Sequence, residues 1–167
     1  MEIGLVCLVD CITSFNMLDT FPICGFHLTV LGQFSTRIFS TECEDGQLFI
    51  LTKPVFYLAK DGRLYQMPKG AQSDGLSVPA FASVFGRTAG GNDWAAGWFH
   101  DCCYRFSLQV WDGMQWAKWD AFQGRSKDAS DAFLYECALV CGDTPEMAET
   151  LFWAVQKFGK RSYQVGA

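Results

Sequence analysis

The sequence has little charge, only two histidines and no dense run of basic residues. Thirteen Lys and Arg residues stand against eighteen Asp and Glu residues, which gives a net charge of -5 at pH 7. Proteins that wrap nucleic acid need clustered basic side chains to neutralise phosphates, so no nucleic-acid partner is expected. Only 19% of the residues are charged and 50% are hydrophobic, a balance that excludes disorder as the main state.

No pair of cysteines has the CxxC spacing of a structural zinc site, although the chain contains 8 cysteines. An even count in a short secreted chain would suggest a disulfide framework. A chain of 167 residues with this much hydrophobic material needs no such covalent links, so free buried thiols are expected. Disulfide bonds between some of them and metal ligation stay open as alternatives.

An uninterrupted apolar run of membrane-spanning length is also missing. The segment from Met1 to Leu18 is apolar, but it contains Glu2 and Asp10 and lacks a basic start. These features argue against a signal peptide and a transmembrane segment, so a soluble protein is expected. Residues 1–25 are predicted to be an N-terminal extension, with Met1 or Met17 as the natural start. Residues 26–167 are predicted to form a single domain.

The domain itself divides into a β-rich half and a helical half. Asp45-Gly46 and Asp61-Gly62 are hairpin turn signals between runs of β-branched and aromatic residues, which predicts an antiparallel meander over residues 26–67. Apolar residues follow helical spacing after Asn92, and three helices are expected, ending near Phe106, Gly142 and Gly159. The predicted fold class is α+β, with a small antiparallel β-meander packed against about three C-terminal helices.

The first candidate for chemistry is the segment that contains His100, Asp101 and Tyr104. Neighbouring side chains on a helix point about 100° apart, so His100 and Asp101 can face one cleft and do separate jobs. Tyr104 lies one turn after His100, on the same face. A neutral imidazole can act as a base, and a carboxylate beside it can bind a cation or activate water. A partly buried histidine beside a solvated aspartate is the alternative.

Two further acids are candidates for the same site. Asp131, early in the second helix, can orient the His100 imidazole, and its alternative role is a first-turn acid that favours the helix dipole. Asp74 can reach the cleft from its loop, and its alternative role is turn chemistry alone. Buried carboxylates must be paired or metal-bound, so either a charged His100 bridges the acids or Asp101 and Asp74 hold a cation. We expect the Asp131 carboxylate within about 8 Å of the His100 ring, the reach of one bridging water.

Three tryptophans flank the polar connection between the first two helices: Trp111, Trp116 and Trp119. Flat indole faces suit the stacking of pyranose rings. Packing of the connection onto the helix pair is the alternative, and burial of all three indoles would exclude sugar binding.

Taken in order, these segments resemble the family called domain of unknown function 1353. The family pattern joins a T/S-D-G/L-x-S-V-P loop to an H-D-x-x-Y helix and an R/K-x-x-A/S-D helix. The chain matches it with Ser73 to Pro79, with His100-Asp101 and Tyr104, and with Lys127 to Asp131. Ser73 stands where threonine is usual and Lys127 where arginine is common. The resemblance covers roughly residues 47–163.

That family is largely phage- and prophage-borne and has no firmly assigned biochemistry. The resemblance therefore implies a fold and a context rather than an activity. It implies a location in the host cytoplasm or the phage virion. It also implies phage structural proteins or cell-envelope components as partners.

The His-Asp helix is also similar to the H-D-x-C-Y run of secreted phospholipases of the A-two type. In those enzymes the histidine is the general base, the aspartate binds calcium, and an aspartate on an antiparallel second helix orients the histidine. The resemblance implies these roles for His100, Asp101 and Asp131. The paired cysteines before the histidine are Ala96 and Gly97 here, and no glycine-rich calcium loop is recognisable.

Two functions of different classes follow from these motifs. One is a hydrolase acting on cell-envelope material, lipid or peptidoglycan, with His100, Asp131 and Tyr104 as catalytic residues. Asp101 and Asp74 would be ligands of its cofactor, a divalent cation. The other is a non-catalytic virion or assembly protein in which the same residues form a buried polar network. A cleft open to solvent favours the enzyme, and a site sealed from solvent favours the structural role.

Overall fold

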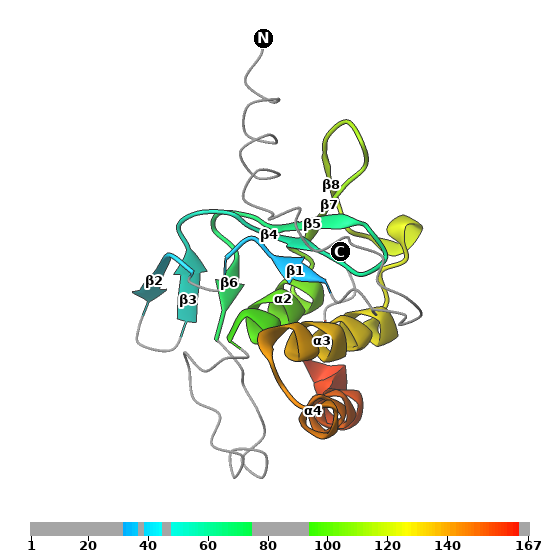
Figure 1. Cartoon of the computed structure of the whole chain (residues 1–167). Coiled ribbons are helices and arrows are strands. Elements are labelled where there is room, and N and C mark those ends of the chain that lie inside the picture. The colour runs from blue at the N-terminus through cyan, green and yellow to red at the C-terminus, as the bar shows by residue number, and fades with distance from the viewer. Residues whose placement is uncertain (1–31, 37–38, 45–47, 75–93, 164–167) are drawn as a thin grey trace, which may run out of the picture. The chain divides into compact units, whose positions relative to one another are not determined.

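The computed structural model describes residues 32–36, 39–44, 48–74 and 94–163, which belong to one compact unit (Figure 1). Its larger sheet has five strands in the order β1-β4-β5-β7-β8, and every pairing is antiparallel. The strands are β1 (Gln33–Phe34), β4 (Val55–Leu58), β5 (Leu64–Met67), β7 (Gln109–Trp111) and β8 (Trp116–Lys118).

A smaller antiparallel sheet has the order β2-β3-β6. Its strands are β2 (Thr41–Glu44), β3 (Leu48–Leu51) and β6 (Gln72–Ser73). Strands β2 and β3 pair as a hairpin around Asp45-Gly46, but that turn and the expected strand start at Phe26 lie outside the described residues. Strand β6 places Ser73 next to the first described helix, where it contributes to a candidate site.

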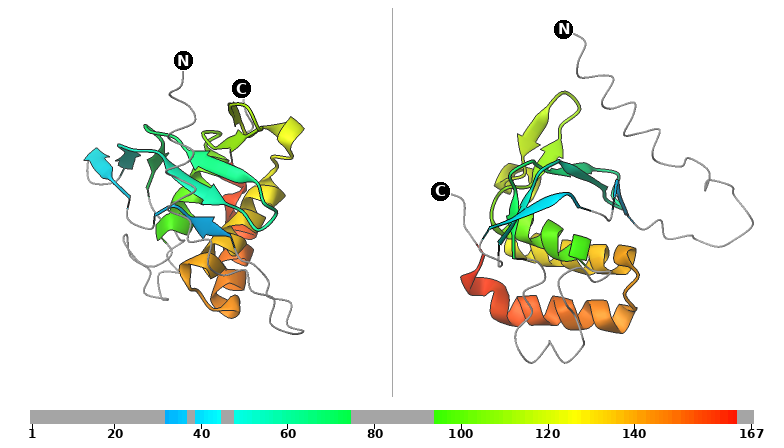
Figure 2. Two further views of the ribbon diagram at one scale, coloured as in Figure 1. Left: turned by 45° about the horizontal axis from the view of Figure 1, so that its top comes forward. Right: turned by 90° about the vertical axis from the view of Figure 1, so that its left-hand side faces the viewer.

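The helices are α2 (Trp94–Tyr104), α3 (Lys127–Cys141) and α4 (Pro145–Phe158), with short 3-10 turns η2 (Ala121–Gln123) and η3 (Gly159–Arg161). Helix α3 packs against both α2 and α4. The larger sheet lies on the side of α2 and α3 that faces away from α4 (Figure 2). The chain thus has the predicted α+β fold, with antiparallel strands packed against C-terminal helices.

Capping side chains and a glycine mark the boundaries of α3 and α4. The Ser126 hydroxyl accepts a hydrogen bond from the Ala129 N–H at 3.0 Å and starts α3. Gly142 ends that helix with a φ of 100°, a conformation that favours glycine. Thr144 and Pro145 then start α4 as the cap and the first helical residue.

The connection between α2 and α3 differs from the expected irregular segment, because it forms the β7–β8 hairpin. Val110 points inward and Trp111 outward, as in any strand with one face on a core. The turn is built on Asp112-Gly113, the same kind of signal as Asp61-Gly62. Strands of three residues are too short to show a clear alternation in the sequence, which is why no strand was expected in this connection.

The core forms where the inner face of the larger sheet meets α2 and α3. The Phe99 ring on α2 lies between Tyr57 of β4 and Tyr65 of β5, with centroid distances of 4.9 and 5.9 Å. Phe133 on α3 completes the contact at 5.4 Å from Phe99. These edge-to-face arrangements are the preferred geometry of aromatic pairs.

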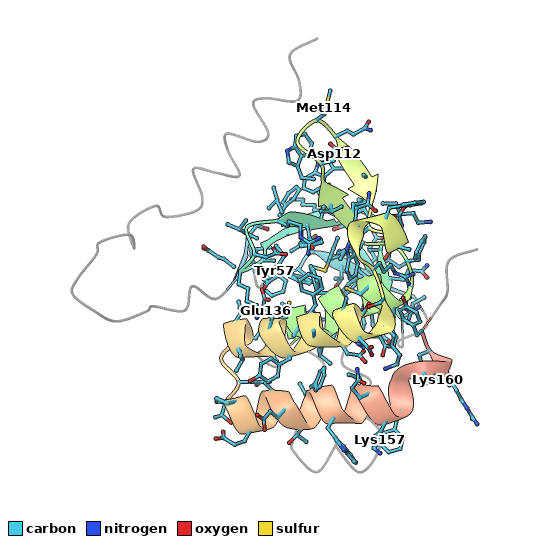
Figure 3. The ribbon with its side chains drawn as sticks, turned by 90° about the vertical axis from the view of Figure 1, so that its right-hand side faces the viewer. Tyr57, Asp112, Met114, Glu136, Lys157 and Lys160 are labelled. Carbon is cyan, nitrogen blue, oxygen red and sulfur yellow. The ribbon has the colours of Figure 1, made fainter. Side chains whose placement is uncertain are left out.

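A buried carboxylate ties the sheet to α3. Glu136 accepts hydrogen bonds from the Tyr57 hydroxyl at 2.6 Å and from the Lys60 backbone N–H at 3.0 Å (Figure 3). Burial and the neighbouring Cys137 and Glu136 raise the pKa of Tyr57, so the tyrosine stays neutral and acts as the donor. This pair fixes how β4 lies along the helix.

The cysteines of the described segments are free thiols. Cys102, Cys103, Cys137 and Cys141 are buried, and burial raises the pKa of Cys102 to about 12. The expectation of free buried thiols is confirmed for these four, which behave as small apolar side chains. The cysteines before residue 32 lie outside the described residues. In the same segments, no helix is long and apolar enough to cross a bilayer.

Replacing Phe99 with Ala tests whether the aromatic core holds the two layers together. We expect the free energy of unfolding to fall by about 3–5 kcal/mol, because the change leaves a cavity between the sheet and the helices. Urea denaturation followed by circular dichroism measures the loss, with Phe99→Leu as the milder control. A loss below about 1 kcal/mol for Phe99→Ala would contradict this description of the core.

Candidate functional site

The Asp131 carboxylate on α3 is completely buried and accepts hydrogen bonds from four side chains. Its Oδ1 contacts His100 Nε2 at 3.2 Å and the Tyr104 hydroxyl at 2.6 Å. Its Oδ2 accepts from Lys127 Nζ at 2.6 Å and from the amide of Gln156. We call these five residues the Asp131 network.

Helix geometry explains why these side chains meet. His100 and Tyr104 are one turn apart on α2, and their rings lie 4.0 Å apart between centroids. Lys127 and Asp131 are one turn apart on α3, and Lys127 Nζ also donates to the Val155 carbonyl of α4 at 3.0 Å. The network therefore links α3 to both α2 and α4, the two helices that pack against it (Figure 2).

The charges of the network follow from burial and hydrogen bonding. Burial alone would raise the pKa of Asp131, but the hydrogen bonds from His100, Lys127 and Tyr104 outweigh it and hold the pKa below its ordinary value. Burial lowers the pKa of His100 despite the opposing effect of Asp131. At pH 7 the carboxylate is charged and the imidazole is neutral, so the charged His100 that would bridge the acids is not what the structure favours.

A neutral imidazole beside an ionised carboxylate has a defined tautomer. Asp131 can only accept, so His100 Nε2 carries the proton and donates it. Nδ1 then holds the lone pair, and none of the described residues makes a hydrogen bond to it. Only 8% of the His100 surface is exposed, so the network is nearly sealed.

A second group of polar side chains lies where β6 meets α2. Asp101 Oδ2 accepts a hydrogen bond from the Ser73 hydroxyl at 2.6 Å, and Arg105 pairs with Asp74 at 3.3 Å. Burial raises the pKa of Asp101 to about 7. The Asp74 carboxyl adds to this rise, through its charge and a shared hydrogen bond, while the Ser73 hydroxyl opposes it. We call these four residues the Asp101 cluster.

The structure thus divides the predicted site residues between two groups. It brings Asp131 together with His100 and Tyr104, as the helix lengths led us to expect, and it brings Asp101 together with Asp74. Across the segments that the structure describes, no hydrogen bond or ion pair links the two groups. His100 faces α3 and Asp101 faces β6, because adjacent residues on a helix point in different directions.

A cation site at Asp101 and Asp74 remains a prediction. Calcium takes six to eight oxygen ligands, and magnesium needs a near-octahedral set. No group of three or more His, Cys, Asp or Glu residues within the described ranges is placed to hold a metal ion. The two neighbouring carboxyls of Asp101 and Asp74 beside Arg105 supply too few donors for either ion, so no catalytic step is assigned to a metal.

Some members of the two groups were not singled out from the sequence as site residues. The sequence does contain a signal for Lys127, since its four-residue spacing from Asp131 places both residues on one helix face. Gln156 and Arg105 had none, because their contacts depend on how α4 and β6 pack. The four-residue spacing shows which face a residue shares, but not what lies against that face.

No family model, curated protein or solved structure matches this chain.

The raised pKa of Asp101 predicts a pH dependence of stability. The folded state disfavours the ionised form of Asp101. The stability that this side chain contributes is therefore fully present at low pH and is lost as pH rises from about 3.8 to about 7. The free energy of unfolding of Asp101→Asn, relative to that of the wild type, should therefore rise across that interval and stay nearly constant above it. Urea denaturation at several pH values measures the difference.

Glu149→Gln, which neutralises an exposed acid on α4, controls for the change in net charge. A difference between Asp101→Asn and the wild type that stays constant from pH 4 to pH 7 would contradict the raised pKa that burial gives Asp101.

Proposed function

We propose that this chain is a phage- or prophage-encoded hydrolase acting on cell-envelope material, with His100 as its general base. One observation carries the proposal: His100 Nε2 lies 3.2 Å from Oδ1 of the fully buried Asp131 carboxylate. Burial lowers the pKa of His100 and the hydrogen bonds lower that of Asp131, which favours a neutral imidazole beside an ionised carboxylate. This arrangement leaves a basic lone pair on Nδ1. Orientation of an imidazole by a buried carboxylate is the recurring device for proton abstraction in hydrolases.

The chemistry assigned to each residue follows from its contacts. Nδ1 of His100 takes a proton from water as the water oxygen attacks an electrophilic carbon or phosphorus of the substrate. The imidazolium then returns that proton to the leaving-group oxygen or nitrogen as the scissile bond breaks, which restores the neutral ring. Asp131 stabilises the imidazolium that forms, and it holds the ring in the required tautomer. Tyr104 and Lys127 act as positioning residues, because both donate to Asp131.

The resemblances set the biological context of the proposal. The ordered motifs resemble a phage-borne family, and the His-Asp helix is similar to that of secreted phospholipases of the A-two type. A phage must cross or remodel the bacterial envelope, so lipid or peptidoglycan is the proposed substrate. Envelope components or phage structural proteins are the proposed partners.

The burial of the network favours a second function, because a site sealed from solvent is what a structural role requires. Asp131 has no exposed surface, and its four donors come from three helices. Fully satisfied polar networks of this kind specify how helices pack. A non-catalytic virion or assembly protein would need the residues for that purpose alone.

Hydrolase assays on phospholipid vesicles and on purified peptidoglycan separate the two functions. For an enzyme, His100→Ala should lower kcat/KM by about 10²–10⁴-fold, the usual contribution of a general base. Asp131→Asn should also lower it, because the amide no longer fixes the imidazole tautomer. The kcat/KM of the wild type should fall with acidity only below the ordinary histidine pKa of 6.5, because His100 stays neutral to lower pH.

Tyr104→Phe is the matched control, since it keeps the ring packed and removes only one of the four donors. It should retain far more activity than His100→Ala. Activity of a folded His100→Ala variant equal to that of the wild type would refute His100 as the base. Loss of stability in His100→Ala, with no hydrolysis by the wild type, would support the structural role. Metal analysis of the purified protein shows whether a cation accompanies it.

A further inference from the structure

The face of the larger sheet that points away from α2 carries aromatic and amide side chains. Tyr65 and Val110 are buried against the helices, so Gln66, Gln109 and Trp111 project from the opposite face. Figure 1 shows that the β7–β8 hairpin extends from this sheet away from α3 and α4. The surface is therefore separate from the Asp131 network.

Two tryptophans form the centre of this surface. Trp111 and Trp116 face each other across the hairpin, with centroids 5.4 Å apart and ring planes at 61°. Trp116 also lies 5.5 Å from the Phe56 ring on β4. Both indoles are only partly buried, whereas Trp119 is 1% exposed and belongs to the core. The predicted packing role thus applies to Trp119, and the other two indoles remain accessible.

The hairpin holds these rings in a fixed position. The Asp112 carboxylate accepts hydrogen bonds from the backbone N–H groups of Met114 and Gln115, both at 2.8 Å. Gly113 adopts a φ of 100°, which completes the turn. Met114 is 88% exposed at the tip, and Figure 3 shows it with Asp112 at the end of the hairpin far from Lys157 and Lys160.

Polar groups accompany the aromatic rings on the same face. Gln66 pairs in register with Gln109, and Gln109 pairs with Lys118, which gives a row of amides and one ammonium group. The Gln66 side-chain oxygen is buried and has no hydrogen-bond partner. A buried acceptor without a donor is unfavourable, so a donor brought by a ligand would be stabilising at this position.

We propose that this hairpin face, formed by Trp111, Trp116, Phe56, Gln66 and Gln109, binds a neutral glycan strand. The apolar C–H face of a pyranose ring stacks on an indole, and a ring hydroxyl or acetamide N–H donates to the Gln66 amide as that side chain turns outward. The Gln109 amide offers a second donor and acceptor. The proposal does not depend on hydrolysis at His100.

A glycan fits these features better than a lipid bilayer does. Insertion of Met114 into a bilayer would bring the Asp112 carboxylate and the amide row out of water, which is costly. A sugar leaves the exposed tip in solvent and uses the amides as hydrogen-bond partners.

Titration calorimetry with the β-1,4-linked tetrasaccharide of N-acetylglucosamine tests the proposal on the full chain. Wild-type protein should bind the sugar, with a shift in tryptophan fluorescence. Trp116→Ala should weaken binding at least about tenfold, while Trp116→Phe keeps an aromatic face and should retain most of the affinity. Gln66→Met, which removes the unsatisfied acceptor without emptying its space, should weaken binding while leaving the protein folded.

Trp153→Ala is the matched control, because Trp153 is a half-exposed tryptophan on α4. It should bind the sugar as the wild type does. The proposal is overturned if the wild type shows no heat of binding at millimolar sugar, or if Trp153→Ala weakens binding as much as Trp116→Ala. Sedimentation with phosphatidylcholine–phosphatidylglycerol vesicles that depends on Trp116, without sugar binding, would assign the surface to a membrane instead.

Discussion

The helical half of this protein depends on one buried anion, the Asp131 carboxylate. An isolated carboxylate cannot be buried at reasonable cost, so each surrounding helix must supply hydrogen-bond donors. Helix α2 supplies His100 and Tyr104, α3 supplies Lys127, and α4 supplies Gln156. The relative positions of the three helices are therefore linked to the solvation of a single side chain.

The same anion determines the state of His100. Burial keeps the imidazole neutral, and the carboxylate selects the tautomer with the proton on Nε2. Asp101, the next residue, faces β6 and has its pKa raised to about 7 by burial and the nearby Asp74. Two adjacent residues on α2 thus have opposite shifts in pKa, each of which favours the uncharged form. Sites that carry out acid–base chemistry commonly contain such shifted groups.

Sequence reasoning predicted local structure well and tertiary partners less well. Ser126, Thr144 and Pro145 mark helix starts through their own side chains, so their positions were predictable. The meeting of His100 with Asp131 was also predictable, because a second helix that returns antiparallel brings its first turns level with the middle of the first helix. The separation of Asp101 from that site was not predictable, since helical periodicity shows the direction of a side chain but not which element packs against it. The β7–β8 hairpin was missed for a related reason, because its strands draw stability from pairing with β5 rather than from their own short pattern.

The tautomer and charge of His100 are most directly tested by ¹⁵N nuclear magnetic resonance of its ring nitrogens. The chain has only two histidines, so a His27→Gln variant leaves a single imidazole to observe. At pH 6.5, where half of a free imidazole is protonated, His100 should be mostly neutral with its proton on Nε2. A mostly charged ring at that pH, or a neutral ring with its proton on Nδ1, would contradict the role assigned to Asp131.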